Sequence, residues 1–379
     1  MNIIVNKLKK LTYIHIIFYV VLATLFLSSI LFVHHNHSFY DQPIVKVLEV
    51  TLEDSTETID MFGNEDVLYT QNIVGQVMNG EEKGRPFIFV NEYSTSGAYD
   101  QPYKVGQELF VKIERVTEDG VSLTGNVMDV KRDKHLLFVS WVFIFILLIV
   151  GRKQGLYSIL TLAINAAIIS YTLDVYLSRP HWNLVFIAGV SVLFFTVISF
   201  LLVNGFNEKT YAAIAATLVA TFVLIVITYL VIWVSDSQGL RYEEMQFLTR
   251  NPEVIFLAGV LVGSLGAVMD VAITMSSSIF GLYEKNQQIS VEALKASGKE
   301  IGKDIMGTMT NILFFVYISG AIPTLVLYMK NDMLWGYTFT MNLSLDIARA
   351  LAGGIGIVLT IPIGIYITIF FINKKRVSQ

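Results

Sequence analysis

The sequence contains no cysteine and has little charge for its length. Without cysteine, no disulfide, thiolate nucleophile or zinc–cysteine site can form. Only 15% of the 379 residues are charged, whereas a soluble domain carries about a quarter. The net charge of −4 is spread between loops and provides no basic surface for a nucleic acid. These absences argue against a soluble protein and against a nucleic-acid partner.

Familiar catalytic motifs are also missing. The sequence has no G-x-x-x-x-G-K-[ST], H-E-x-x-H or G-x-S-x-G pattern, so it predicts no ATP hydrolysis, zinc protease or serine hydrolase chemistry. The apolar segments contain no recognisable nucleophile–base pair, although an intramembrane enzyme stays an open alternative. We therefore expect no catalytic residues, no cofactor and no enzymatic activity.

Long apolar runs dominate the chain. Hydrophobic residues make up 54% of it, and the mean hydropathy is +0.59. Several runs exceed the roughly 18 residues that indicate a membrane-spanning helix. The sequence thus predicts an α-helical polytopic membrane protein with about eight transmembrane helices and the lipid bilayer as its partner. Their approximate ranges are Ile14–Val33, Leu136–Val150, Gly155–Leu173, Leu184–Val203, Tyr211–Val234, Val254–Ile273, Ile305–Tyr328 and Leu343–Ile372, with Ser290–Asp304 as an amphipathic connection.

Residues 39–134 have a different composition, because short β-type runs separated by glycines replace the long apolar segments. About ninety residues with five strands suit a small β-barrel, for which an OB-like fold is one candidate. The expected strands are Ile44–Val50, Asn72–Val77, Pro86–Val90, Glu108–Val116 and Val121–Met128. We predict an N-terminal tail and anchor helix (1–38), a β-rich domain between the first two helices (39–134), and a seven-helix membrane domain (135–379).

The positions of lysine and arginine predict the orientation, since cytoplasmic loops carry an excess of both. Eight spans with the N-terminus inside put thirteen basic residues in the cytoplasm and four in short outer loops. The inner set is Lys7, Lys9, Lys10, Arg152, Lys153, Lys209, Lys285, Lys295, Lys299, Lys303, Lys374, Lys375 and Arg376, and the outer set is Arg179, Arg241, Arg250 and Lys330. Both termini are then cytoplasmic, and residues 39–134 are extracytoplasmic.

One carboxylate, Asp270, lies within the apolar run Val254–Ile273. It belongs to a set of small and polar residues whose steps of four, three, four, four and three average 3.6, which predicts one stripe along a helix. The set is Gly259, Gly263, Gly266, Asp270, Thr274 and Ser277. The glycines favour close helix packing. An acidic residue inside a membrane helix usually faces a bundle interior or a water-filled cavity.

The next helix carries a second polar face at the same predicted depth. Asp270 lies about 24 Å below the outer boundary of a core about 30 Å thick. Asp304, Thr308 and Asn311 share one face near the cytoplasmic entry of that helix. We therefore predict a cluster of these four residues, whose oxygen atoms suit a proton or a hard cation. Two alternatives stay open: Asp270 reaches the interface near a helix end, or the polar residues only lock the helices together.

A further polar pair lies near the outer end of the last span. Asp346 and Arg349 are three residues apart, so they can form an ion pair on one helix face. Their depth, within about 10 Å of the outer boundary, puts Arg349 too far from Asp270 for direct contact. Gly353 and Gly356 continue this face as expected packing positions. We favour an internal ion pair over a substrate-binding site.

Three histidines follow the first predicted span. His34, His35 and His37 lie near Asp41 and are weak candidates for a metal or pH-responsive site. The interpretation that we favour is that these histidines lie at the membrane surface beside a linker and have no such role.

Two sequence blocks resemble the YibE/F-like family of bacterial multispan membrane proteins. The first runs Gly263-Ser-Leu-Gly-Ala-Val-Met-Asp270-Val-Ala, and the second runs Gly302-Lys-Asp304-Ile-Met-Gly307-Thr-Met-Thr-Asn311. The resemblance extends from about Gly151 to the C-terminus, and the β-domain is also similar to that family. It implies a bacterial cell membrane location and makes Asp270, Asp304, Thr308 and Asn311 motif positions. It supplies no substrate, because the family is described mostly as predicted membrane proteins or permeases.

Two functions from different classes follow as hypotheses. The first is a secondary transporter or permease for an unknown ion or small molecule, with a cation- or proton-linked site near the cytoplasmic side. The second is a non-transporting cell-envelope protein whose residues 39–134 bind a partner or a wall component.

Overall fold

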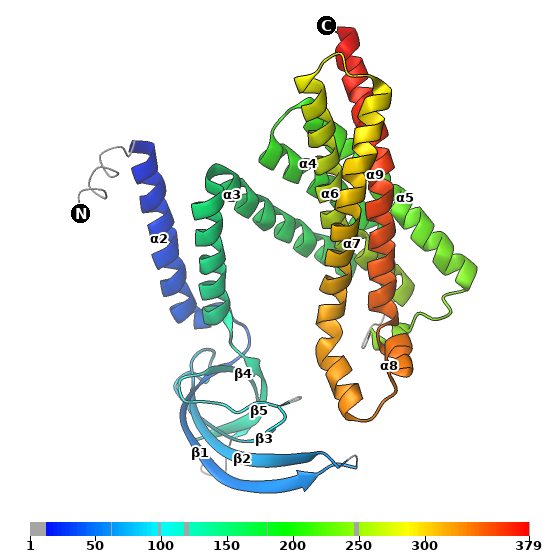
Figure 1. Cartoon of the computed structure of the whole chain (residues 1–379). Coiled ribbons are helices and arrows are strands. Elements are labelled where there is room, and N and C mark those ends of the chain that lie inside the picture. Colours follow the sequence, from blue (N-terminus) through cyan, green and yellow to red (C-terminus); the bar gives the residue numbers. More distant parts are fainter. Residues whose placement is uncertain are drawn as a thin grey trace, which may run out of the picture. The chain divides into compact units, whose positions relative to one another are not determined.

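A computed structural model describes residues 13–61, 63–97, 100–116, 121–179, 181–245 and 250–378. The chain forms two compact units, residues 1–147 and 148–379, and each is described by itself (Figure 1). The first unit contains the β-domain with the helical segments on either side of it. The second contains the remaining helices.

Five strands form the predicted β-rich domain. They are β1 (Ile44–Ile59), β2 (Glu65–Val77), β3 (Pro86–Ser94), β4 (Glu108–Val116) and β5 (Leu123–Val130). They close into a barrel in the order β1-β2-β3-β5-β4, in which only the β3–β5 pairing is parallel. Alternate residues of the strands point inward, as a two-residue period requires, and fill the barrel with an apolar core. The largest fully buried side chains of this core are Phe87, Ile73, Leu109 and Leu123.

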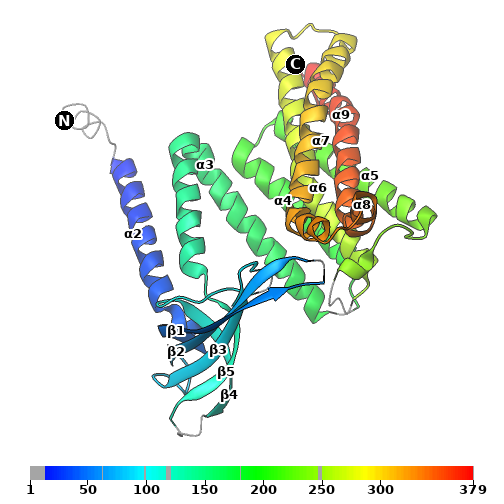
Figure 2. The same ribbon diagram turned by 60° about the horizontal axis from the view of Figure 1, so that its bottom comes forward.

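The first two strands continue beyond the barrel as a hairpin arm. β1 pairs with β4 only over Ile44–Lys46, whereas its pairing with β2 continues to Ile59 opposite Glu65. Figure 2 shows this hairpin projecting from the barrel. Sequence analysis ended β1 at Val50, because the Thr- and Glu-rich residues that follow lack the alternation of a half-buried strand. We call residues 48–66 the β1–β2 arm.

Helix α2 (Tyr13–His35) and the first part of α3 (Asp133–Ser178) flank the barrel in the sequence and pack against each other. The indole N–H of Trp141 donates a 2.9 Å hydrogen bond to Ser29, and the Trp141 ring meets Phe26 edge-on at 5.2 Å. A short 3-10 helix, η1 (Asn36–Phe39), joins α2 to β1. The Asn79 side chain binds this connection by donating to the carbonyls of His37, Tyr40 and Gln42.

Helix α3 changes the expected number of helices. The predicted spans 136–150 and 155–173 both lie in this one 46-residue element, which is interrupted only at Arg152, where φ is 49° and ψ is −120°. Counted as one element, α3 brings the number of helices long and apolar enough to cross a membrane to seven in the described residues. Its two helical parts, before and after the kink at Arg152, correspond to the two predicted spans.

The second unit is a bundle of long helices. These are α4 (Leu184–Asn204), α5 (Glu208–Ser235), α6 (Pro252–Lys285), α7 (Val291–Lys330) and α9 (Ser344–Ser378), with the short η2 (Tyr242–Glu244) and α8 (Trp335–Asn342). Asparagine or serine caps begin α4 to α7 by accepting hydrogen bonds from their first turns. Helix α6 is packed among α4, α5, α7 and α9 (Figure 1). The predicted connection Ser290–Asp304 is the N-cap and first part of α7, with no break before the apolar part.

Glycine allows α9 to approach its neighbours closely. A Cβ atom on Gly353 would lie 2.7 Å from Leu313 of α7, and one on Gly356 would lie 3.1 Å from Leu224 of α5 and 3.2 Å from Val268 of α6. Both glycines are buried. The structure thus places these two expected packing positions in helix contacts.

Candidate functional site

The small and polar stripe of α6 lies on its most exposed face, which Tyr317 of α7 contacts at Gly263. Three sides of the helix are buried against other helices, whereas the stripe residues Gly259, Gly263, Gly266, Asp270 and Thr274 are exposed. Asp270 has no hydrogen-bond or ion-pair partner among the residues that the structure describes. It also lies fifteen residues before the helix ends at Lys285, about 22 Å along the axis. Asp270 therefore does not lie at an end of α6.

On α7, the predicted polar residues face away from α9. A Cβ atom on Gly302 would collide with Ile361, so the side of α7 that carries Gly302 faces α9. At 100° per residue, Asp304, Thr308 and Asn311 lie about 180–240° around the helix from it, and all three are exposed. Among the described residues, no hydrogen bond or ion pair joins them to Asp270. The two polar faces thus lie on neighbouring helices, α6 and α7.

The pair Asp346–Arg349 forms the most defined charged feature of the second unit. A guanidinium N–H of Arg349 donates to Asp346 Oδ1 at 2.8 Å, and each side chain is about a quarter exposed. The guanidinium also lies 5.6 Å above the ring of the buried Phe256 of α6, a cation–π contact. The ion pair predicted from the three-residue spacing is thus present and connects α9 to α6.

Tyr317 of α7 contacts the α6 stripe, which sequence analysis did not predict. Its hydroxyl group is buried and has no hydrogen-bond partner among the described residues, and it faces Gly263 so closely that a Cβ there would collide with it. A tyrosine inside an apolar run resembles an ordinary core aromatic residue, so the sequence carried no signal for this role. Gly263 lies on the α6 stripe, about 10 Å along the helix axis from Asp270.

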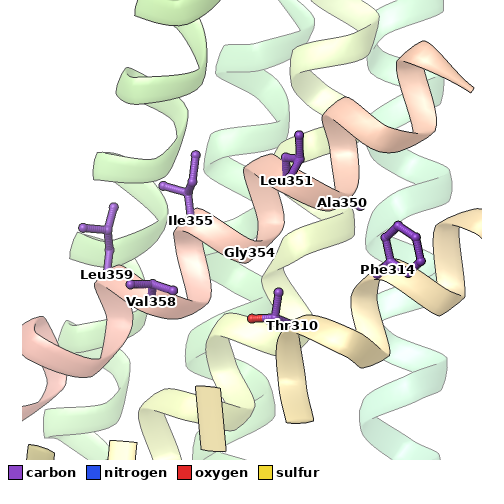
Figure 3. A pocket seen from close by; sticks show the side chains of 8 residues that line it. All are labelled: Thr310, Phe314, Ala350, Leu351, Gly354, Ile355, Val358 and Leu359. Carbon is purple, nitrogen blue, oxygen red and sulfur yellow. The ribbon is translucent and has the colours of Figure 1, made fainter. Parts of the chain in front are cut away.

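An apolar groove lies between α7 and α9. Its volume is about 380 Å³. Figure 3 shows Thr310 and Phe314 on one helix and the residues of α9 on the other. The lining consists of Thr310, Phe314, Ala350, Leu351, Gly354, Ile355, Val358 and Leu359. With Thr310 as its only hydroxyl, the groove suits an apolar occupant and offers nothing to a charged one.

The histidines do not form a metal site in the described part of the chain, where no cluster of three ligating side chains occurs. The Nδ1 atoms of His34 and His35 lie 2.8 and 3.0 Å from carbonyls of their own helix. His37 instead lies 3.2 Å from the carboxylate of Glu108. That contact belongs to a buried ionic cluster where the barrel meets α2 and α3.

Glu108 is the centre of this junction cluster. It is 7% exposed and pairs with Lys134 at 2.6 Å and with Lys131 at 3.3 Å. Lys131, 1% exposed, also pairs with Asp133 at 2.7 Å, and Asp133 accepts from Asn36 of η1. Burial alone would raise the pKa of Glu108, but the hydrogen bond and charge of Lys134, with the charges of Lys131 and His37, hold that pKa below its usual value. The cluster fixes the barrel to the ends of both helices.

These features define a class of protein in which a closed β-barrel precedes a bundle of membrane-length apolar helices. Comparison with family models makes the assignment specific. The model described as YibE/F-like protein matches residues 139–374, and the YibE/F family N-terminal domain matches residues 38–130. The chain therefore belongs to the YibE/F-like family, as the two sequence blocks predicted. No curated protein and no solved structure matches it.

Proposed function

We propose that this protein is a secondary transporter, or permease, of a bacterial cell membrane, with a cation- or proton-linked site at Asp270. The observation that supports it most is that Asp270, inside a 34-residue apolar helix, is exposed and without a partner among the described residues. A charged side chain inside the hydrocarbon core is costly, up to about 2.5–3.5 kcal/mol at the centre. Water, a proton or a bound cation at Asp270 removes that cost, and each of these implies access from an aqueous side.

The exposed residues Asp304, Thr308 and Asn311 of α7 supply the other oxygen atoms of this proposed site. A transporter alternates between states, largely by movement of rigid elements around a fixed site. We propose that the two polar faces approach each other in one of these states. A proton or a hard cation between Asp270 and Asp304 then offsets the repulsion of the two carboxylates. A helix lock without transport would instead keep these side chains in permanent contact.

The proposed topology has eight crossings, with α3 crossing twice and turning at Arg152. Both termini are then cytoplasmic, and the barrel is extracytoplasmic. Arg152 and Lys153 at the turn agree with this orientation, since basic residues prefer the cytoplasmic side. Lys7, Lys9 and Lys10 lie outside the described residues, so their part in this proposal rests on the sequence alone. The strand order with a parallel β3–β5 pairing supports an OB-like barrel.

Thermal unfolding of the full chain in nanodiscs tests the ion site. We expect the Tm of the wild-type protein to depend on pH, sodium or potassium, since a ligand of the native state alone stabilises it. Asp270→Asn should lose that dependence. Asp332→Asn is the matched control, because Asp332 is exposed between α7 and α8 at φ 55°, a conformation that asparagine tolerates. The same ion and pH response in wild type and Asp270→Asn would contradict the proposal.

The alternative is a non-transporting envelope protein, and the β1–β2 arm favours it. The arm carries seven acidic residues and no basic one, namely Glu49, Glu53, Asp54, Glu57, Asp60, Glu65 and Asp66. Such a surface attracts cationic partners. We expect the full chain in nanodiscs to bind oligolysine in a salt-dependent manner and the variant Glu53→Gln/Asp54→Asn/Glu57→Gln to bind it less. Equal binding would contradict a role of the arm in partner recognition.

A further inference from the structure

Strand β1 has an outer edge that no other strand of the first unit covers. Its pairing with β4 ends at Lys46, and the main chain of Val47 makes the last bonds on that side, donating to Gln107 at 2.8 Å and accepting from Gly106 at 2.9 Å. From there to Ile59, β1 pairs only with β2 in the described part of this unit. Within the β1–β2 arm, β1 is therefore an edge strand (Figure 2).

The hydrogen bonds of β2 show which groups of β1 point to the open edge. Glu57 lies opposite Val67, and the Val67 carbonyl accepts a 3.0 Å hydrogen bond from the N–H of Thr95 on the far side of β2. Val67 thus turns its main chain away from β1, and in an antiparallel pair the residue opposite does the same. The N–H and C=O groups of Glu57 therefore face the open edge, and those of Ser55 and Ile59 follow by the two-residue period.

Two further hydrogen bonds agree with this alternation. The N–H of Asp60, which belongs to the other set of residues, donates across the arm to the carbonyl of Asn64 at 3.0 Å. The N–H of Ser55 is bound by the carboxylate of Asp54, next to it in the sequence, at 2.7 Å. At the open edge, Ser55 thus offers a carbonyl, whereas Glu57 offers both a donor and an acceptor.

The charge of the arm restricts what can pair with this edge. The arm has seven acidic residues and no basic one, and Glu53, Asp54 and Glu57 are exposed on the edge strand itself. A second copy of β1 would bring acidic side chains opposite one another, and like charges across a strand pair are destabilising. An extended segment that carries lysine or arginine would form the same main-chain ladder with opposite charges across it.

We propose that the open edge of β1, residues 50–59, binds an extended basic segment of another polypeptide as an added β-strand. The main-chain groups of Glu57 and Ile59 pair with that segment and provide affinity. Glu53, Asp54 and Glu57 attract its lysine and arginine side chains and provide specificity. This inference rests on the alternative function, in which residues 39–134 bind a partner, and it is independent of transport.

Fluorescence anisotropy with the full chain in nanodiscs of phosphatidylcholine, which has no net charge, tests the strand addition. The probe is a labelled heptapeptide of alternating lysine and valine. The same peptide N-methylated at its three central amides keeps the charge but loses those donors. We expect the wild-type protein to bind the first peptide and to bind the second at least about tenfold more weakly, because the ladder hydrogen bonds are lost. Empty nanodiscs give the background.

Glu57→Pro and Glu57→Gln form a matched pair on the protein side. Both remove the carboxylate, but only proline removes the N–H that faces the open edge, a position at which edge strands tolerate proline. We expect Glu57→Gln to weaken binding at most about fivefold, as for one exposed ion pair. Glu57→Pro should weaken it at least about fivefold further, with the same circular dichroism spectrum as Glu57→Gln, because a ladder hydrogen bond is lost.

The outcomes overturn different statements. Equal binding of the two peptides by the wild-type protein, or equal binding of the first peptide by the two variants, would overturn strand addition and leave the arm as a surface for cationic partners. Stronger binding of a peptide with the sequence of residues 48–60 would overturn the basic partner in favour of a second copy. No binding of either heptapeptide or of oligolysine would overturn the alternative function as well. Ion flux in proteoliposomes is a separate measurement that none of these outcomes predicts.

Discussion

The contact between Tyr317 and Gly263 shows how one missing side chain positions a polar group. A β-carbon at position 263 would collide with the hydroxyl, so in Gly263→Ala the Tyr317 side chain or the helices must shift. We predict that Gly263→Ala destabilises the protein by about 1–3 kcal/mol through overpacking. Tyr317→Phe in the same chain should recover most of the loss, because it removes the colliding atom. Thermal unfolding of the two variants checks this.

Gly266→Ala is the control for that prediction. It lies on the same stripe, but no atom lies within 4 Å of the position of its Cβ. Its Tm should equal or slightly exceed that of the wild type, since alanine favours helix over glycine. Equal losses at positions 263 and 266 would show that the Tyr317 contact does not determine the packing.

The buried Glu108 gives the first unit a pH-dependent contribution to stability. Because its pKa in the folded protein is lowered, the stabilisation is fully present above the pKa of the unfolded chain, near 4.3. It is lost as the pH falls through the lower folded value. Glu108→Gln should therefore destabilise the unit by about 1.5–3 kcal/mol at pH 7, because Lys134 loses a charge-assisted hydrogen bond and Lys131 loses one of its two acidic partners. The loss should be smaller in acid, where Glu108 is protonated in both states. Unfolding measured from pH 3 to 7 checks both statements.

The matched control is Glu82→Gln, which removes an acidic partner from a partly exposed pair with Arg85. Pairs of that kind contribute at most about 1 kcal/mol. A Glu108→Gln variant as stable as this control at pH 7 would contradict the role of the junction cluster.

From the sequence, the residues that share one helix face could be predicted better than the contacts between residues of different elements. The stripe through Asp270 and the pair Asp346–Arg349 follow from helical spacing alone, since both are local patterns. The pairing of His37 with Glu108 joins positions 71 residues apart, and Tyr317 meets Gly263 across two helices. Such contacts depend on how the elements pack, which a single sequence does not reveal.

At the scale of elements, α3 contains the clearest backbone strain. Arg152 has φ 49° and ψ −120°, a conformation that glycine adopts far more easily than arginine. We predict that Arg152→Gly stabilises the protein by up to about 1 kcal/mol, less the entropy that glycine adds to the unfolded chain. Lys153→Gly, one residue later in helical conformation, should cost about 0.5–1 kcal/mol. Loss of stability in both variants would show that no strain is stored at Arg152.

Element lengths were harder to predict than their existence. The apolar run ending at Ile273 defined a span, but α6 continues to Lys285 because Ser276, Ile279, Phe280 and Tyr283 pack inside the bundle. Hydropathy alone does not detect such a polar but packed extension. The predicted β1 was too short for a related reason. Pairing with β2, rather than an apolar core, stabilises the β1–β2 arm.

At the scale of the whole molecule, the absence of cysteine makes the proposed topology testable. Single cysteines at exposed positions report which side of the membrane they face. We expect Thr56→Cys and Asp332→Cys to react with an impermeant maleimide in intact cells. Lys153→Cys and Gln288→Cys should react only after permeabilisation. If α3 crossed the membrane once, the positions 288 and 332 would exchange sides, which would contradict eight crossings.

Cation flux through the reconstituted protein tests the central claim most directly. Proteoliposomes with the full chain should show a sodium or proton flux down an imposed gradient, measured with an ion-sensitive dye. Asp270→Asn should reduce the flux to that of empty liposomes, whereas Asp332→Asn should leave it unchanged. An equal flux in wild type and Asp270→Asn would contradict a coupling role for Asp270, and no flux from the folded wild-type protein would contradict transport itself.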